Sequence, residues 1–266
     1  MSVYRLTPGR VPLLISLPHV GTEIPPELHD RLVPRALQSE DTDWHLERLY
    51  APLAQALGAS LLVPRYSRYV IDLNRPPDDA PLYPGAKGGT GLVPTRFFTD
   101  EPLYHSGAEP DAAEIAARRE ACWRPYHEAL AAEMGRLRAE HGHARLFEGH
   151  SIRSVLPWLF DGQLPALNLG TADGAACAPA ITARLADVLA GQADYSQVVN
   201  GRFKGGYITR HFGRPAEGWH AVQLEMCWRC YMDEDLPPRE AWDDGRAAAV
   251  TPLLRRLLEE LLACPA

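Results

Sequence analysis

Two histidines follow apolar segments that lie far apart in the chain. The run LLISLPHVG places His19 after one segment, and ARLFEGHSIRS places His150 after another. Apolar runs of this length that are bounded by Pro or Gly predict buried strands. Because ligands of open α/β sheets bind at the carboxyl ends of strands, both imidazoles are expected at one edge of a sheet. Two histidines at such an edge can share a metal ion, and the first hypothesis is a metal hydrolase.

A catalytic zinc site commonly has three ligands from His, Asp and Glu, and the third ligand must come from a carboxylate. Glu23 lies shortly after His19, whereas Asp41 and Asp43 lie where the next helix is expected to begin. A carboxylate at a helix start is also explained as an N-cap, and with two aspartates Asp41 can cap while Asp43 binds metal. The spacing leaves both Asp43 and Glu23 open as the third ligand.

A candidate general base stands late in the chain, in the segment HAVQLEMCWR. Glu225 lies near the end of this apolar run. A carboxylate that faces an activated water can accept its proton and pass it to a leaving amine. The alternative is a structural ion pair with Arg229. A base beside two histidines and an acid favours an enzyme over a binding module, which needs no base.

Side chains that could bind an anionic substrate occur in two segments. SRYVIDLNRPP offers Arg68, Asn74 and Arg75, and Asp72 within it is expected to orient Arg68. Asn and Arg together can hold a carboxylate or polarise a carbonyl. The segment NGRFKGGYITRHFG is interpreted either as a loop that closes over an anionic substrate or as a hairpin turn. Its candidate binding residues are Asn200, Arg202, Tyr207 and Arg210.

Composition narrows the class of protein. The chain has 266 residues, of which 46% are hydrophobic, and a net charge of −7. This charge argues against a nucleic-acid partner bound through phosphate neutralisation. No apolar stretch approaches the roughly 20 residues that span a bilayer, so we expect no membrane partner. The 5 scattered cysteines, in a chain without a recognisable signal peptide, favour a cytoplasmic protein without disulfides.

Expected strands alternate with expected helices along the chain. Beyond the two histidine segments, the strands are ASLLVPRY, SRYVIDLN, LPALNLGT, YSQVVN and HAVQLEMC. Helices are expected over residues 41–58, 111–142, 178–190 and 245–263, and a long surface loop over 75–110. This order predicts an α/β fold with a mostly parallel or mixed sheet and helices on both faces. We expect a single domain over residues 1–266.

Taken together, the motifs resemble the N-formylglutamate amidohydrolase family. The resemblance runs from about residue 12 to 232 through SLPHVGTEIP, DTDWHLERLY, SRYVIDLNRPP, EGHSIRSVLP, LNLGT, NGRFKGGYITRHFG and VQLEMC. It implies hydrolysis of N-formyl-L-glutamate to formate and L-glutamate, the last step of one histidine-degradation route. The family is in turn similar to zinc carboxypeptidases and aspartoacylase-like enzymes, which implies a zinc-carboxypeptidase-like three-layer sandwich.

That analogy also implies how the metal ion is held. His19, Asp43 and His150 would bind one divalent ion, expected to be zinc, with Glu23 as the alternative to Asp43. His and carboxylate ligands also suit manganese, iron, cobalt or nickel.

The remaining catalytic roles follow from the same analogy. Glu225 would take the water proton, and Arg75 would stabilise the oxyanion or grip a substrate carboxylate. Further carboxylate contacts would come from Arg68, Arg153, Arg202 and Arg210. Three alternatives stay open. The first is a metal amidohydrolase or carboxypeptidase-like enzyme for another N-acyl amino acid or a short peptide. The second is a metal- or amino-acid-binding module. The third is a redox protein that uses Cys227 and Cys230.

Overall fold

A seven-stranded mixed sheet forms the centre of the protein in the computed structural model, which describes residues 2–81 and 90–265. The strands follow one another in the order β1-β3-β2-β4-β7-β5-β6. Their bounds are β1 Tyr4–Thr7, β2 Leu13–Ser16, β3 Ser60–Pro64, β4 Ala144–Ile152, β5 Leu167–Gly170, β6 Gln197–Val199 and β7 Trp219–Cys227. The predicted mixed α/β class is therefore confirmed.

The central strands are parallel and buried. β2 pairs in parallel with β3 and with β4, and β4 pairs in parallel with β7. β1 is antiparallel to β3, and β5 is antiparallel to β7 but parallel to β6. Every residue of β2, β4 and β7 is buried. Strands covered on both faces need apolar side chains on both, which explains why these segments read as near-continuous apolar runs.

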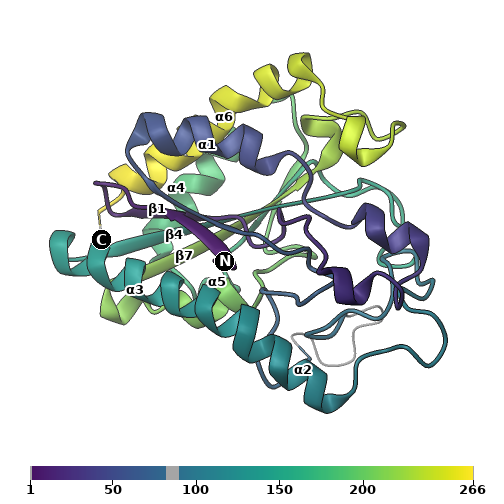
Figure 1. Cartoon of the computed structure of the whole chain (residues 1–266). Coiled ribbons are helices and arrows are strands. Elements are labelled where there is room, and N and C mark those ends of the chain that lie inside the picture. The colour runs from purple at the N-terminus through teal and green to yellow at the C-terminus, as the bar shows by residue number, and fades with distance from the viewer. Residues whose placement is uncertain (1, 82–89, 266) are drawn as a thin grey trace.

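Helices cover both faces of the sheet (Figure 1). α1, α4 and α6 pack on one face, where alternate strand residues such as Leu13 and Ile15 belong to the core. α3 and α5 pack on the other face, against Leu14 and Leu146. The helix bounds are α1 Leu46–Leu57, α2 Ala112–Arg118, α3 Arg124–His141, α4 Pro179–Ala190, α5 Tyr207–Phe212 and α6 Asp244–Ala263.

The register of the central strands places chemical groups side by side. In the β4–β7 pair, His150 lies opposite Glu225. In the β2–β4 pair, Ser16 lies opposite Glu148, and the chain reaches His19 shortly after β2 ends. Because all three strands run in the same direction, their carboxyl ends meet at one edge of the sheet, as predicted.

Several local predictions differ from the structure. His150 lies within β4 rather than after it. The segment SRYVIDLN is not a strand but a series of turns, because Asp72 accepts a hydrogen bond from the amide of Asn74 and Val70 donates to the carbonyl of Ser67. Side-chain acceptors of this kind compete with strand pairing.

Three further elements also depart from the prediction. The expected helix over 111–142 is divided into α2 and α3 by a π-helical turn, Arg119–Trp123. The glycine-rich segment after residue 200 leads into α5 rather than a hairpin, and the N-terminal strand β1 was not expected. Of the predicted surface loop 75–110, residues 82–89 lie outside the described part of the chain.

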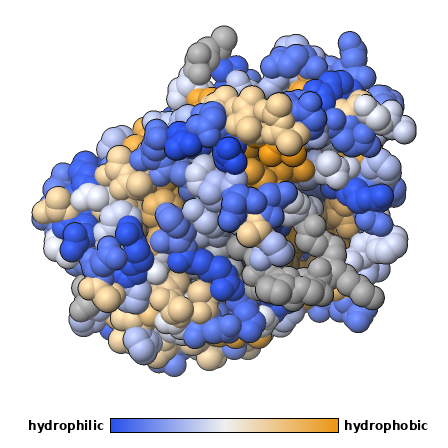
Figure 2. Space-filling view, turned by 90° about the horizontal axis from the view of Figure 1, so that it is seen from below, coloured by the Kyte–Doolittle hydropathy of each residue, from blue (hydrophilic) through white to orange (hydrophobic). Residues whose placement is uncertain are grey.

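The molecular surface is polar over much of the face seen in Figure 2, where hydrophilic side chains are interspersed with apolar ones. The large apolar side chains that are exposed in the described residues are Val155, Trp158 and Leu236. No helix of the described residues has the length and apolar character required to cross a membrane.

Candidate metal centre and active-site cavity

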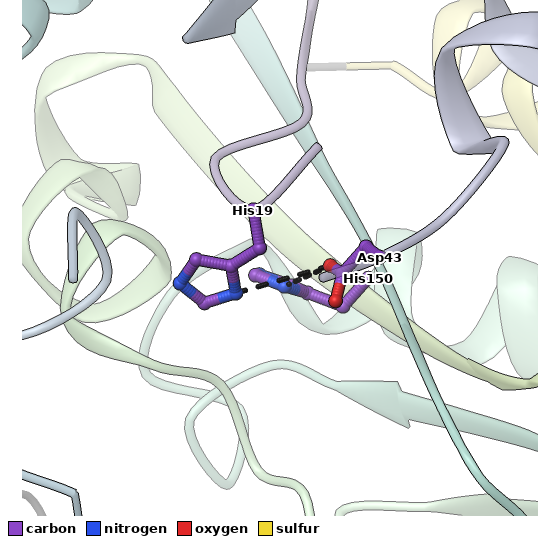
Figure 3. Close-up of side chains that lie close together, drawn as sticks. All are labelled: His19, Asp43 and His150. Carbon is purple, nitrogen blue, oxygen red and sulfur yellow. Dashed lines mark hydrogen bonds and ion pairs between the residues drawn. The ribbon is translucent and has the colours of Figure 1, made fainter. Parts of the chain in front are cut away.

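His19, Asp43 and His150 form a buried cluster at the carboxyl edge of the sheet, called the His–Asp–His cluster below. Both imidazoles point towards the carboxylate of Asp43 (Figure 3). Asp43 Oδ2 lies 3.1 Å from His150 Nδ1 and 3.8 Å from His19 Nδ1, and the three ligand atoms all lie within 4.8 Å of one another. Ligand atoms on a tetrahedral zinc ion lie about 3.3 Å apart, so small movements suffice to hold one.

Asp43 reaches the cluster because it does not cap the helix that follows it. Its amide donates to the carbonyl of His19 at 3.0 Å, which ties the two ligand segments together. α1 then begins after His45, whose φ of 64° turns the chain sharply, and no side chain caps this helix. Asp41 is used elsewhere, since it accepts hydrogen bonds from the Tyr69 hydroxyl and the Phe98 amide. The N-cap explanation of Asp43 was therefore wrong.

Glu23 lies outside the cluster. Its backbone pairs with residues 65–67, and its carboxylate forms a 2.7 Å ion pair with Arg65 at the surface. Gly21 permits this pairing, because a Cβ there would lie 2.1 Å from the carbonyl oxygen of Tyr66. The geometry thus favours Asp43 over Glu23 as the third ligand.

In each imidazole, the nitrogen that points away from Asp43, Nε2, contacts a second carboxylate. His19 Nε2 lies 2.7 Å from Asp72, and Asp72 accepts a 2.6 Å bond from Arg68, the partner expected for it. His150 Nε2 lies 2.7 Å from Glu148. In a neutral imidazole, a carboxylate that accepts the hydrogen of Nε2 leaves the lone pair on Nδ1, which is the nitrogen that faces Asp43 in both residues.

Burial and charge act differently on the two imidazoles. Burial lowers the pKa of His19, and the nearby Arg68 adds to this effect against the attraction of Asp72. Burial also opposes protonation of His150, but the carboxylates of Glu148 and Asp43 outweigh it and raise its pKa well above the usual value. Despite its burial, Asp72 has a pKa well below its usual value, because His19 and Arg68 stabilise its ionised form.

Glu225 lies beside the cluster on β7. It is buried, and burial raises its pKa to about 8, against the attraction of His150 and with a smaller repulsion from Asp43. The expected alternative, an ion pair with Arg229, is not formed; Arg229 donates to the carbonyl of Leu164 at 2.8 Å instead. The pKa of Glu225 therefore lies close to neutral pH, and its carboxyl group stands next to a candidate metal centre.

The cluster opens into a cavity of about 440 Å³. Four predicted substrate-binding residues line it: Arg68, Asn74, Arg75 and Arg202. Arg75 makes its hydrogen bonds to neutral oxygens, the carbonyls of Asn74 and Thr90 and the hydroxyl of Thr90. No carboxylate of the described residues forms an ion pair with Arg75, although its charge helps to lower the pKa of the buried Asp72, so its guanidinium at the cavity wall can pair with an anionic substrate.

The other predicted substrate-binding residues do not line this cavity. Arg153 donates to the carbonyl of Glu234 and lies over the ring of Trp228. Asn200 accepts bonds from the amides of Thr171 and Asp173. Tyr207 packs against aromatic side chains, and Arg210 donates to the carbonyl of Gly205. These four residues lie outside the described wall of the cavity and make their contacts within other segments of the chain.

Two polar residues of the site were missed by the sequence reasoning. Gln223 lines the cavity and accepts the amide of Gly206 at 2.8 Å, and Glu148 holds His150. Each lies two positions before a residue that was singled out on the same strand, namely Glu225 or His150. Side chains two apart on a strand share a face, and this period could have identified both.

The C-x-x-C pair is structural in character. Cys227 and Cys230 are free, buried thiols that donate to backbone carbonyls. Burial raises the pKa of each thiol to about 12. Because the thiolate is the reactive form, such cysteines are poor redox nucleophiles, which argues against the redox alternative.

Comparison with known proteins supplies independent evidence. A model of the N-formylglutamate amidohydrolase family matches residues 11–232. An N-formylglutamate deformylase of Pseudomonas aeruginosa is 52% identical over 255 residues, covering 96% of this chain and 94% of the relative. The Pseudomonas putida N-formylglutamate deformylase is 50% identical over the same shares. The crystal structure of an N-formylglutamate amidohydrolase from Ralstonia eutropha superposes with a TM-score of 0.79 at 26% identity, covering 98% of this chain and 96% of that one.

Proposed function

Because the chain belongs to the N-formylglutamate amidohydrolase family, we propose that it hydrolyses N-formyl-L-glutamate to formate and L-glutamate. One structural observation carries the mechanism: the buried His–Asp–His cluster stands beside Glu225 at the end of a cavity with arginines on its wall. Hydrolysis of an amide needs an activated water and a group that protonates the leaving nitrogen, and this arrangement can provide both.

The donor set of the cluster suits a divalent cation, and we propose zinc. Two imidazole nitrogens and one carboxylate oxygen leave a fourth position open, which is the pattern of catalytic zinc sites. When bound, such an ion would polarise the formyl carbonyl and lower the pKa of a water. Asp43 supplies the negative charge, and the hydrogen bonds to Asp72 and Glu148 keep each Nδ1 lone pair directed at the ion.

Glu225 is the proposed proton carrier. In its ionised form it accepts a proton from the attacking water, and it then donates that proton to the amide nitrogen as the C–N bond breaks. Positive charge at the cluster favours the ionised form, which offsets the effect of burial on its pKa. Its position opposite His150 in the β4–β7 register keeps the carboxylate next to the cluster.

The arginines of the cavity wall are proposed to recognise the two substrate carboxylates. Arg75 is the first choice, because its guanidinium is fixed by neutral oxygens and forms no ion pair with a carboxylate of the described residues. Arg68 is buried between Asp72 and the ring of Phe98, so its charge is oriented rather than mobile. Asn74 and Arg202 also line the cavity and can add hydrogen bonds.

The wider setting of the reaction is also a proposal. The substrate and products are those of the last step of one histidine-degradation route, as the family resemblance implies. The five cysteines are all free thiols, which favours a reducing compartment such as the cytoplasm. We further propose that the sheet and its two groups of helices form one zinc-carboxypeptidase-like three-layer domain.

A substrate panel tests this proposal. Formate release from N-formyl-L-glutamate is measured beside N-formyl-L-alanine, and glutamate release from N-acetyl-L-glutamate is measured in parallel. We expect efficient turnover of the formyl glutamate alone. Arg75→Met should raise KM for N-formyl-L-glutamate and narrow its advantage over N-formyl-L-alanine, whereas Arg124→Met, on the exposed face of α3, should change neither. Preferential release from another acyl group or from a short peptide would refute the substrate assignment.

A further inference from the structure

The imidazole of His150 is oriented by a buried chain of hydrogen bonds that leads away from the cavity. Two groups approach its Nε2, the carboxylate of Glu148 at 2.7 Å and the side-chain amide nitrogen of Asn74 at 3.1 Å. Nε2 carries either a hydrogen or a lone pair, so it bonds to one of them. The ionised carboxylate forms the stronger bond, and Nε2–H therefore donates to Glu148.

The second oxygen of Glu148 is fixed by one residue. Thr209 donates both its backbone amide, at 3.1 Å, and its hydroxyl to Glu148 Oε2. Glu148 and Thr209 are fully buried, and within residues 2–81 and 90–265 Glu148 forms an ion pair only with His150. Apart from His150, the carboxylate is therefore positioned by the neutral donors of Thr209.

Thr209 is itself held in place by the polar residues of the site. It lies in α5, where the amide of Ile208 donates to Asn74 Oδ1 at 2.9 Å. Gly206, the residue immediately before α5, donates its amide to Gln223 at 2.8 Å. A Cβ at Gly206 would lie 2.3 Å from the side chain of Asn74, so glycine permits this close packing. The start of α5 is therefore fixed relative to β4 and β7, and the hydroxyl of Thr209 has a defined direction.

We propose that Thr209 is a positioning residue for the metal centre: by fixing Glu148, it sets the tautomer and ring orientation of His150 and so strengthens metal binding. The proposal rests on the metal dependence proposed above. Thr209 touches neither the ion nor the substrate. Its contribution is to keep the Nδ1 lone pair of His150 aimed at the position between Asp43 and His19. Outer partners of metal-bound histidines commonly change metal affinity by about 10- to 100-fold.

The test compares metal affinity among matched variants. Thr209→Val keeps the shape of the side chain but removes the hydroxyl, and Thr209→Ser restores it. Thr251→Val is the control, because this threonine donates to the carbonyl of Ala247 within α6, far along the chain from the site. Dissociation constants for Zn²⁺ are measured by competition with a chelator, and the visible absorption of the Co²⁺-loaded proteins reports ligand geometry.

We expect Thr209→Val to bind Zn²⁺ about 10-fold more weakly and to change the Co²⁺ spectrum, with Thr209→Ser and Thr251→Val close to the unmodified chain. The double variant of Glu148→Gln and Thr209→Val should bind Zn²⁺ only slightly more weakly than Glu148→Gln alone. Thr209 acts through the carboxylate that Glu148→Gln already removes. Unchanged affinity in a folded Thr209→Val protein, or additive effects in the double variant, would overturn the proposal. Failure of the unmodified chain to bind Zn²⁺ would instead refute the metal centre itself.

If Thr209→Val fails to fold, the same comparison is made with Thr209→Ala, alone and combined with Glu148→Gln. An effect on the unfolding free energy of the metal-free protein alone, with metal affinity unchanged, would show a purely structural role and would also overturn the proposal.

Discussion

The two histidines of the cluster are oriented in different ways. His19 lies in a loop after β2, and its partner Asp72 is neutralised by the guanidinium of Arg68. His150 lies within β4, and its partner Glu148 sits on the same strand and is held by the neutral donors of Thr209. Both arrangements fix the outer nitrogen of an imidazole. Only the His19 side also places a cation, Arg68, on the cavity wall.

The His19 side and the His150 side of the site therefore differ in the charge that they present. On the His150 side, no arginine or lysine of the described residues pairs with Glu148, and the carboxylates of Glu148 and Asp43 raise the pKa of His150 against the effect of burial, which suits a bound cation. On the His19 side, Arg68 balances Asp72, and burial together with Arg68 lowers the pKa of His19. We infer that the His150 side chiefly serves the metal ion, whereas the His19 side serves both the ion and the anionic substrate. Variants that act on one side only can test this division.

The largest effect is expected from a residue that belongs to neither side. Glu225→Gln keeps the size of the side chain but cannot carry a proton, so kcat should fall by roughly 10²- to 10⁴-fold. Metal content should stay at the level of the unmodified protein, because both histidines keep their partners. Steady-state formate release and metal analysis on the same preparation check this. Full turnover with metal retained would contradict the assigned role.

A steric change before α5 should disturb the site through Asn74, whose side chain reaches His150 and whose backbone amide donates to Asp72. Gly206→Ala would bring a Cβ to 2.3 Å from the side chain of Asn74, which lies beside His150 and on the cavity wall. Displacement of this kind by about 1 Å lowers kcat/KM by about 10²-fold. Gly135→Ala in α3 is the control, since its added Cβ would meet no atom within 4 Å beyond the local backbone of its own helix. Equal activity of the two variants would show that the packing at Gly206 is irrelevant to catalysis.

The carboxylate partners provide the direct comparison of the two sides. Asp72→Asn and Glu148→Gln should each weaken metal binding, by about 10- to 100-fold. The effect of Asp72→Asn should be the larger, because it leaves the charge of Arg68 uncompensated near a divalent cation. Chelator competition measures both. A reversed order would show that the charge of Arg68 does not reach the cluster, and the proposed division of tasks would be wrong.

A third buried histidine, outside the cluster, should affect stability rather than chemistry. His127 Nε2 donates to the carbonyl of Leu73 at 2.8 Å, and its ring stacks on Trp123. Burial lowers its pKa to about 3, whereas the unfolded chain titrates near 6.5. The unfolded state thus binds more protons in this range. The contribution of His127 to the free energy of unfolding is therefore fully present above about pH 6.5 and is lost as the pH falls towards 3.

His127→Phe reports this contribution. Denaturant unfolding at pH 7 and at pH 4.5 should show that the free-energy gap between the unmodified protein and the variant narrows at the lower pH. A gap of constant size would mean that His127 does not titrate differently in the folded state.

The strand-end argument placed His19, His150 and Glu225 at one edge of the sheet, as the structure has them, because it needs only apolar runs and strand direction. The choice between Asp43 and Glu23 depended on contacts remote in sequence, since the backbone pairing of Glu23 with residues 65–67 draws Glu23 away from the site. Glu148 was missed because a carboxylate inside a buried strand has no local signature of its role. SRYVIDLN was wrongly predicted as a strand because its apolar composition outweighed the turn-forming bonds of Asp72.

Metal titration of the metal-free protein shows whether turnover depends on an ion held by His19, Asp43 and His150. Chelator-treated protein is supplied with N-formyl-L-glutamate, and formate release is followed as Zn²⁺ is added in fractions of one equivalent per chain. We predict negligible release without metal, a linear rise, and a break at one equivalent that is absent in His150→Ala. Full turnover by metal-free protein would contradict the account.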